Sequence, residues 1–283
     1  MSSIERAMDA GRRRGAGPAA SAREPLAPTN PEAARPESEP SAKAKRVVEL
    51  DLVELRRRGL VTPEGSDPRL EEEYRLAKRP ILKQAFPRGL DAAPRANLAL
   101  ITSSTPGEGK TFTAFNLAMS IATEMDHTVL LVDGDVTRST LTRWLGMAGQ
   151  PGLTDVLDDP DVGLGQVITA TNLAKLRVIP AGRPHARATE LMASGAMDRI
   201  AEDLAGRYPD RMVLFDSSPL LMASQSPVLA NLVGQVVMVV EAGRTPQQSV
   251  RDALNLIDQS ATKVGFLLNK TPVGKHSGYF GAY

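Results

Sequence analysis

Short apolar runs alternate with amphipathic segments along most of the chain after residue 96. The amphipathic segments at 111–125, 187–206 and 245–259 have apolar residues at helical spacing. The apolar runs, rich in Val, Leu and Ile, predict strands at 97–103, 128–133, 176–182, 211–216, 235–243 and 263–269. Nearly continuous apolar strands separated by helices are typical of a sheet that is buried on both faces. The pattern therefore predicts an α/β fold with a mostly parallel sheet and helices on both faces.

The N-terminal part of the chain has a different pattern. Residues 11–45 are rich in Pro, Ala and charged side chains and contain almost no large apolar residue. Such a segment buries too little apolar surface to offset its chain entropy. Apolar residues return in "VVELDLVELRRRGLVTPEG", which we expect to dock on the main domain, and "DPRLEEEYRLAKRPILKQAF" predicts a helix capped by Asp67. The predicted organisation is a disordered N-terminal segment and linker with a short helix at 4–10 (1–45), a docking segment followed by a helix (46–96), the α/β domain (97–270) and a flexible tail (271–283).

A glycine-rich loop, "SSTPGEGKT" at 103–111, lies between a predicted strand and a predicted helix. Its glycines let backbone N–H groups converge on phosphate oxygens, and the start of the helix adds its positive dipole end. Lys110 is expected to neutralise the β- and γ-phosphates of ATP, and the Thr111 hydroxyl to bind Mg²⁺. The loop departs from the usual pattern at Ser104, where the first glycine normally stands. The predicted nucleotide-binding residues of this loop are Thr105, Pro106, Gly107, Glu108, Gly109, Lys110, Thr111 and Phe112.

Aspartates close two of the predicted strands. Asp133 and Asp135 follow the strand at 128–133, and Asp216 ends the strand at 211–216. One such aspartate is most often a helix cap or a turn former. Because ligands bind beyond the carboxyl ends of parallel strands, the three together favour metal binding and acid–base chemistry. We expect Thr111, Asp133 and Asp216 to bind Mg²⁺ and Lys110, Asp133 and Asp135 to act in catalysis, with either Asp133 or Asp135 as the base.

Composition and charge exclude several classes of protein. The formal net charge of the 283 residues is +1, which gives no overall field for nucleic acid. The chain has no cysteine, so disulfides and thiolate chemistry are excluded. No apolar run is long enough to span a membrane, and the N-terminus has charges where a signal peptide needs an apolar centre. We expect a soluble cytoplasmic protein that reaches the inner membrane only through a partner.

The combined motifs resemble those of the bacterial protein-tyrosine kinases. The resemblance rests on "SSTPGEGKT", on "VLLVDGDVTR" with Asp133, Asp135 and Arg138, and on "VLFD" with the Ser-Ser-Pro that follows it, and it extends over about 68–283. It includes "PAGRPHARATELMAS" and "EAGRTPQQSV", while "SSIERAM", the linker and "LVTPEG" resemble the branch encoded with exosortase-linked exopolysaccharide systems. The family shares ancestry with septum-site and plasmid-partition ATPases, so the implied fold is a P-loop NTPase of the MinD/ParA-like group.

The resemblance implies an ATP- and Mg²⁺-dependent autokinase that regulates exopolysaccharide production. Its implied partners are other copies of itself in a ring, a membrane-embedded polysaccharide chain-length (co-polymerase) protein and a cognate tyrosine phosphatase. The implied phosphate acceptors are Tyr279 and Tyr283 in the acid-free tail, where Phe280 stands at a position that a tyrosine would often take. Asn269 is implied to touch the adenine, although a turn role is equally consistent with its place after a strand.

A second implied feature is an oligomerisation motif on the helix at 67–86. Glu72, Arg75 and Lys78 match its Glu-x-x-Arg-x-x-Arg pattern, with lysine in the last place, and their spacing predicts a shared helix face. The alternative functions are a ParA/MinD-like ATPase switch without kinase activity and an adaptor that uses nucleotide only to assemble. Against the switch, Thr105 replaces the extra lysine of the ATPase loop, and "GYFGAY" does not form an amphipathic membrane helix.

Overall fold

The computed structural model describes residues 47–63, 65–88, 92–208 and 210–272. The chain divides into two units, 1–42 and 43–283, and every described residue belongs to the second unit. The predictions for 1–45 lie outside the described residues, as do those for the tail beyond its first two residues. Within the described ranges, no helix has the length and apolar character needed to cross a bilayer.

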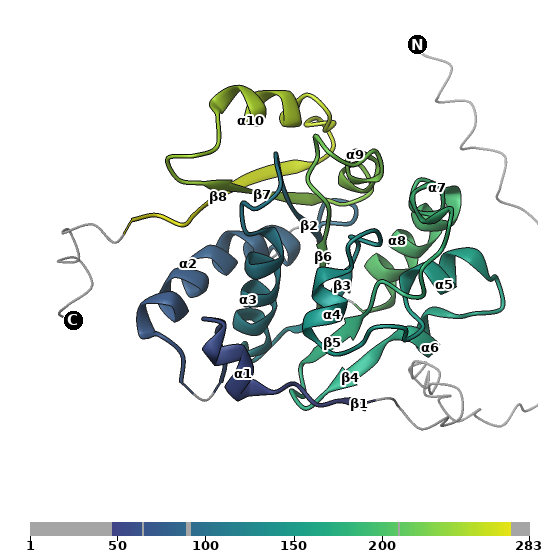
Figure 1. The fold of residues 1–283 in the computed structure, drawn as a ribbon, viewed down its shortest axis with the longest axis horizontal. Helices are drawn as coiled ribbons and strands as arrows, with labels where there is room; N and C mark the ends of the chain where they lie inside the picture. Colours follow the sequence, from purple (N-terminus) through teal and green to yellow (C-terminus); the bar gives the residue numbers. More distant parts are fainter. Residues whose placement is uncertain (1–46, 64, 89–91, 209, 273–283) are drawn as a thin grey trace, which may run out of the picture. The chain divides into compact units, whose positions relative to one another are not determined.

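One eight-stranded sheet forms the centre of the described unit (Figure 1). Its strand order is β1-β4-β5-β3-β6-β2-β7-β8, and neighbouring strands are parallel except for the antiparallel pair β4 and β5. The strands are β1 (Val47–Val48), β2 (Leu98–Ser103), β3 (Thr128–Asp133), β4 (Thr169–Thr171), β5 (Leu176–Ile179), β6 (Arg211–Asp216), β7 (Gln235–Glu241) and β8 (Lys263–Asn269). The predicted α/β class and the six predicted strands are confirmed, while β1 and β4 are additional.

Helices cover both faces of this sheet, as the apolar pattern predicts. The helices are α1 (Leu52–Arg57), α2 (Pro68–Ala85), α3 (Lys110–Ala122), α4 (Thr140–Trp144), α5 (Leu153–Asp158), α6 (Leu164–Val167), α7 (Ala188–Met192), α8 (Gly195–Arg207), α9 (Gln225–Ala230) and α10 (Gln247–Leu254). One apolar core lies between the sheet and α1 to α4, and a second lies between the sheet and α5 to α10 (Figure 1).

The central strands feed both cores because successive side chains of a strand point to opposite faces. In β2, Ala99 and Ile101 belong to the core under α3, whereas Leu98 and Leu100 belong to the core under α8. All six residues of β2 are buried. The apolar residues of the run therefore face protein on either side, which is why it does not alternate with polar residues.

The helix predicted at 67–86 is confirmed as α2. The Asp67 carboxylate accepts a hydrogen bond from the Arg69 N–H at 2.9 Å, and Pro68 occupies the first turn, where its missing N–H has no helical partner to lose. The single helix predicted at 187–206 is wrong in one respect, because α7 and α8 are separate. Ser194 lies between them, and its hydroxyl accepts a hydrogen bond from the Ala196 N–H at 3.3 Å, which caps α8.

The segment before α2 packs on the edge of the sheet and on α3. The side chain of Asn172 accepts a hydrogen bond from the Leu50 N–H at 3.1 Å and donates one to the Leu50 carbonyl at 3.2 Å. The Asn116 side chain of α3 accepts from the Val61 N–H at 2.8 Å. Leu55 and Leu60 are buried in the adjoining core. This segment thus contacts the helix that follows the glycine-rich loop.

Candidate nucleotide and phosphoryl-transfer site

The glycine-rich loop joins β2 to α3 near the middle of the sheet, where β2 lies between β6 and β7. Gly107 and Gly109 have φ angles of 88° and 100°, a left-handed region that disfavours other residues. α3 begins at Lys110 without a side-chain cap and without an acid in its first turn. Its first N–H groups are therefore left for an anionic ligand.

Three carboxylates are buried at the same edge of the sheet. Asp133 ends β3 and Asp216 ends β6, and the two residues are paired in register across the neighbouring strands. Asp135 lies two residues past β3, and each of the three is at most 1 % exposed. The structure therefore brings together the carboxylates that the sequence predicted to converge.

Asp216 is a buried carboxylate without a satisfied partner. Neither of its oxygens accepts a hydrogen bond from the described residues. Burial, and then the charge of Asp133, raise the pKa of Asp216 well above its ordinary value, while the Thr111 hydroxyl and the Lys110 charge oppose this rise. Lys110 and Thr111 thus lie close to Asp216 without completing its hydrogen bonding. A free carboxylate beside a threonine hydroxyl at a phosphate loop fits Mg²⁺.

Asp133, in contrast, has hydrogen-bond donors at both of its carboxylate oxygens. One of its oxygens accepts from the Thr142 N–H at 2.8 Å and from the Thr142 hydroxyl at 2.7 Å, and the other accepts from the Asp135 N–H at 3.2 Å. The Thr142 hydroxyl also accepts from the Ala181 N–H at 2.8 Å. Burial raises the pKa of Asp133 to about 6, although the bonds from Thr142 lower it in part.

Asp135 has one oxygen occupied. This oxygen accepts from the Ser218 hydroxyl at 2.7 Å and from the Arg138 N–H at 3.2 Å. Thr142 and Ser218 were not identified from the sequence. Ser218 belongs to the Ser-Ser-Pro that follows β6 and is part of the family motif, although the motif does not indicate its contact with Asp135, and nothing in the sequence around Thr142 indicates its contact with Asp133.

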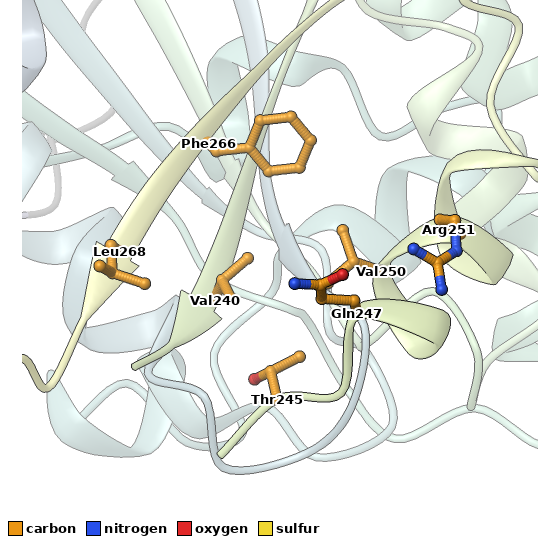
Figure 2. Close-up of a pocket in the computed structure, with 7 residues that line it drawn as sticks. All are labelled: Val240, Thr245, Gln247, Val250, Arg251, Phe266 and Leu268. Atoms are coloured by element: carbon orange, nitrogen blue, oxygen red, sulfur yellow. The ribbon is translucent and has the colours of Figure 1, made fainter. Parts of the chain in front are cut away.

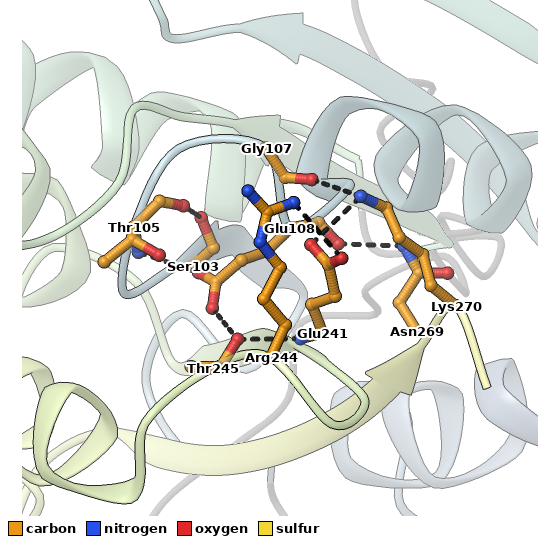
Figure 3. Close-up of polar contacts among 9 residues, drawn as sticks. All are labelled: Ser103, Thr105, Gly107, Glu108, Glu241, Arg244, Thr245, Asn269 and Lys270. Atoms are coloured by element: carbon orange, nitrogen blue, oxygen red, sulfur yellow. Dashed lines mark hydrogen bonds and ion pairs between the residues drawn. The ribbon is translucent and has the colours of Figure 1, made fainter.

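The glycine-rich loop also contacts three residues that follow or end the strands β7 and β8 (Figure 3). The Asn269 side chain donates to the Glu108 carbonyl at 2.8 Å, and the Thr245 hydroxyl donates to the Glu108 carboxylate. Lys270 donates to the Gly107 carbonyl at 2.7 Å. The amide of Asn269 therefore binds the loop itself, and its adenine contact stays a prediction.

The other predicted loop residues have different environments. Lys110 and Thr111 are each 8 % exposed at the start of α3. The Phe112 side chain, in the first turn of α3, is partly buried against the apolar core on that face of the sheet. Among the described residues, no group of three His, Cys, Asp or Glu side chains forms a metal site. Mg²⁺ in a phosphate-loop site typically uses only one or two carboxylates together with substrate phosphates, so this finding does not exclude it.

An apolar cavity of about 370 Å³ lies between α10 and the edge strand β8 (Figure 2). Phe266 and Leu268 on its strand side are 59 % and 61 % exposed. Thr245 lines the cavity and also contacts the glycine-rich loop through its hydroxyl. None of the three buried aspartates lines the cavity.

Only some of the tyrosines lie within the described residues. Tyr74 in α2 is 5 % exposed, and burial raises its pKa. The Tyr208 ring lies under the Arg211 guanidinium, whose carbon is 3.6 Å from the ring centroid. Tyr279 and Tyr283 lie outside the described residues.

The predicted oligomerisation residues do not all share one face. Arg75 donates to the Glu72 carboxylate at 2.6 Å on the surface of α2. Lys78 is 4 % exposed and turns inward, where its ammonium donates to the Ser120 carbonyl at 2.6 Å and pairs with Glu124 at 2.6 Å. The expectation of a shared face is therefore wrong for Lys78, because its charge meets the C-terminal end of α3.

Comparison with curated proteins finds relatives of known class. The chain is 32% identical over 185 residues to the tyrosine-protein kinase YwqD of Bacillus subtilis, a match that covers 64% of this chain and 76% of the relative. It is 33% identical over 198 residues to the succinoglycan biosynthesis transport protein ExoP of Rhizobium meliloti, covering 68% of this chain but only 25% of that protein. No family model matches the chain.

Solved structures place the fold in the same group. The VpsO kinase domain superposes with a TM-score of 0.59 at 27% identity, covering 71% of this chain and 96% of that domain. The cell-division ATPase MinD of Pyrococcus furiosus shares the fold with a TM-score of 0.52 at 21% identity, over 63% of this chain and 73% of that one. The predicted fold of the MinD/ParA-like group is confirmed.

Proposed function

The chain belongs to the bacterial protein-tyrosine kinase family, and from this we propose that it transfers the γ-phosphate of Mg-ATP to tyrosines in the C-terminal tail of another copy. The observation that carries the proposal is the fully buried carboxylate of Asp216 beside Lys110 and Thr111, which has no hydrogen-bond partner in the part of the chain that the structure describes. A charged group of this kind is costly unless a cation completes its surroundings. A Mg-nucleotide supplies that cation.

The residues of the loop have separate roles in this proposal. The N–H groups of the loop and of the first turn of α3 bind phosphate oxygens, and Lys110 neutralises the charge that develops during transfer. Thr111 and Asp216 hold Mg²⁺, which, when bound, draws charge from the transferring phosphate. Asp133 completes this acidic edge of the site from the neighbouring strand.

Asp135 is the base that the contacts favour. Both oxygens of Asp133 already accept hydrogen bonds from backbone or hydroxyl groups. Asp135 has such bonds on one oxygen only within the described part of the chain. The remaining oxygen is thus available to a tyrosine hydroxyl, which needs a nearby carboxylate because its pKa is near 10.

Tyr279 and Tyr283 are the proposed acceptors. The chain has four tyrosines, and the described pair, Tyr74 and Tyr208, is packed against the protein. A buried hydroxyl in α2 cannot reach a second copy's site without local unfolding. Tyr279 and Tyr283, which lie beyond the described residues, therefore remain as the proposed acceptors, and we propose that they are phosphorylated by another copy.

The names of the relatives support a proposal for the biological setting. ExoP is named for succinoglycan biosynthesis and transport, and this chain spans about a quarter of its length, as it does for the tyrosine-protein kinase ptk of Acinetobacter johnsonii. We propose that this chain regulates exopolysaccharide synthesis or export from the cytoplasmic side. Its partners in the proposal are a membrane-embedded co-polymerase protein, which recruits it to the inner membrane, further copies of itself, and a tyrosine phosphatase.

The test is phosphate mapping on purified protein. The full chain is treated with phosphatase, incubated with Mg-ATP and analysed by mass spectrometry, beside the Lys110→Met variant. The proposal predicts phosphotyrosine on the wild-type chain and a loss of about a hundredfold or more in Lys110→Met, since the main charge facing the phosphates is removed. ATP hydrolysis with no phosphotyrosine, even with the membrane partner added, would instead favour an ATPase switch.

A further inference from the structure

A group of side chains, which we call the loop clamp, fixes the glycine-rich loop on the side of β7 and β8: Glu108, Thr245, Asn269 and Lys270 (Figure 3). We propose that Glu108 and Thr245 are positioning residues for phosphate binding, which fix the loop backbone without touching the nucleotide. The inference rests on the proposed role of the loop in binding ATP.

Glu108 is the centre of the clamp. Its side chain is buried, with the residue 2 % exposed, although it lies in a loop at the surface of a binding site. One carboxylate oxygen accepts from the Thr105 N–H at 2.7 Å, and the other accepts from the Thr245 hydroxyl. Both oxygens are therefore occupied by the protein, so this acid is turned away from the phosphates that it would repel.

Thr245 connects the loop to the turn between β7 and α10. Its hydroxyl donates to Glu108 and accepts from the Glu241 N–H at 3.0 Å. The turn is thus hydrogen-bonded on one side to β7 and on the other to the glycine-rich loop. A hydroxyl at position 245 is needed for both bonds, because the same oxygen serves as donor and acceptor.

Asn269 and Lys270 hold the loop from the end of β8. The Asn269 amide donates to the Glu108 carbonyl at 2.8 Å, and Lys270 bridges the Gly107 carbonyl at 2.7 Å and the Glu241 carboxylate at 3.0 Å. A side chain at Gly109 would collide with the Asn269 amide, in addition to its unfavourable φ. These contacts fix two successive carbonyls of the loop, those of Gly107 and Glu108, from the end of β8.

Such a clamp matters because glycines make the loop easy to deform. Gly107 and Gly109 can adopt left-handed conformations, but they also have more conformational freedom to lose on binding. A loop that is already fixed in the binding conformation loses less of this entropy when phosphate arrives. The clamp therefore predicts a contribution to nucleotide affinity from side chains that make no contact with nucleotide.

The test compares two pairs of full-length variants. Thr245→Val and Glu108→Ala remove the contact, whereas Thr245→Ser and Glu108→Gln retain groups able to form it. The affinities for Mg-ATP and Mg-ADP are measured by calorimetry, together with kcat, KM and Tm. The clamp predicts about tenfold weaker binding for the first pair, from the loss of a bond to a buried charge, and near wild-type binding for the second. The double variant Glu108→Ala with Thr245→Val should lose less affinity than the sum of the two single losses, because the contact between the two side chains is counted in both.

A matched control is Gln248→Ala on the exposed face of α10, where the Gln248 amide contacts only Asp252 and Arg251 among the described residues. Unchanged nucleotide affinity in folded Thr245→Val and Glu108→Ala would overturn the clamp, as would equal losses in Thr245→Ser. A fall in Tm alone would show a merely structural role and would also overturn it. If Thr245→Val does not fold, the affinities of Glu108→Ala and Glu108→Gln are compared in the same way.

Failure of the clamp and failure of the proposed function can be distinguished, because the readout for the clamp is nucleotide affinity. A wild-type chain that binds ATP but phosphorylates nothing would reject the proposed function, and the affinities of the variants would still test the clamp.

Discussion

At the scale of single residues, Asp216 shows how a binding site differs from a core. It is fully buried at the end of β6, and neither oxygen has a hydrogen-bond partner within the described ranges. Burial raises its pKa well above the ordinary value. A structural aspartate in this place would be expected to have its oxygens paired, as Asp133 has. Burying this unpaired carboxylate costs free energy, which is consistent with a role in binding a cation.

Replacing Asp216 with Asn tests this interpretation. The substitution removes a buried charge at nearly constant volume, so the free protein should become more stable, by roughly 2–4 °C in Tm for each kcal/mol of charge burial relieved. Mg²⁺-dependent tyrosine phosphorylation should fall by about a hundredfold. Calorimetric melting without nucleotide and a phosphorylation assay measure the two effects. A lower Tm together with intact phosphorylation would show that Asp216 is a structural residue.

Single residues also show where sequence reasoning ends. Asp133, Asp135 and Asp216 could be identified because each follows an apolar strand, and the carboxyl ends of parallel strands meet at one edge. Thr142 and Thr245 could not, because their contacts depend on how loops pack over the sheet. Lys78 was assigned to the oligomerisation motif by the family resemblance and to a helix face shared with Glu72 and Arg75 by its spacing, yet its side chain turns inward.

At the scale of elements, the residues of the predicted oligomerisation motif on α2 have two different environments. Lys78 binds the Ser120 carbonyl in the last turn of α3 and pairs with Glu124, which lies just past the end of that helix. Such a cation satisfies an end carbonyl and favours the negative end of the helix dipole. Glu72 and Arg75 remain on the surface of α2 as a pair. Stability and self-association are therefore expected to depend on different residues of the same motif.

Two variants separate these effects. Lys78→Met should reduce the free energy of unfolding by about 1–2 kcal/mol, because the buried end of α3 loses its cation. Glu72→Ala with Arg75→Ala should leave Tm within a degree or so, since exposed ion pairs contribute little, while weakening self-association. Thermal melting and light scattering provide the two readouts. An unchanged oligomer in the double variant would show that this surface of α2 is an ordinary solvated surface and not an interface between copies.

The elements themselves could be predicted to different extents. The long buried strands gave clear signals, because runs such as 128–133 are apolar on both faces. β1 and β4 have two and three residues and gave none. The break between α7 and α8 was missed because amphipathic spacing continues across Ser194, whose extended backbone and capping hydroxyl start a new helix.

At the scale of the whole molecule, strand order creates the site. β2 lies between β6 and β7, so that the loop after β2 meets Asp216 on one side and the clamp from β7 and β8 on the other. This order is not read from the apolar pattern, since any order of parallel strands would give similar runs. The family resemblance implied only the fold class, a P-loop NTPase of the MinD/ParA-like group, which the structure confirms, and the strand order is known from the structure. In the proposed reaction, one copy supplies the nucleotide site and another copy supplies the tail tyrosines.

The central claim, transfer between copies to the tail, is tested most directly by mixing two full-length variants. One is Lys110→Met, with an intact tail, and the other carries Tyr279→Phe and Tyr283→Phe, with an intact nucleotide site. After phosphatase treatment and incubation with Mg-ATP, mass spectrometry maps phosphate in each chain. We expect phosphotyrosine at Tyr279 and Tyr283 of the Lys110→Met chain in the mixture, little in either variant alone, and near wild-type ATP affinity in the tail variant. Phosphate on Tyr74 or Tyr208, or normal labelling of the tail variant with none on its partner, would contradict the account.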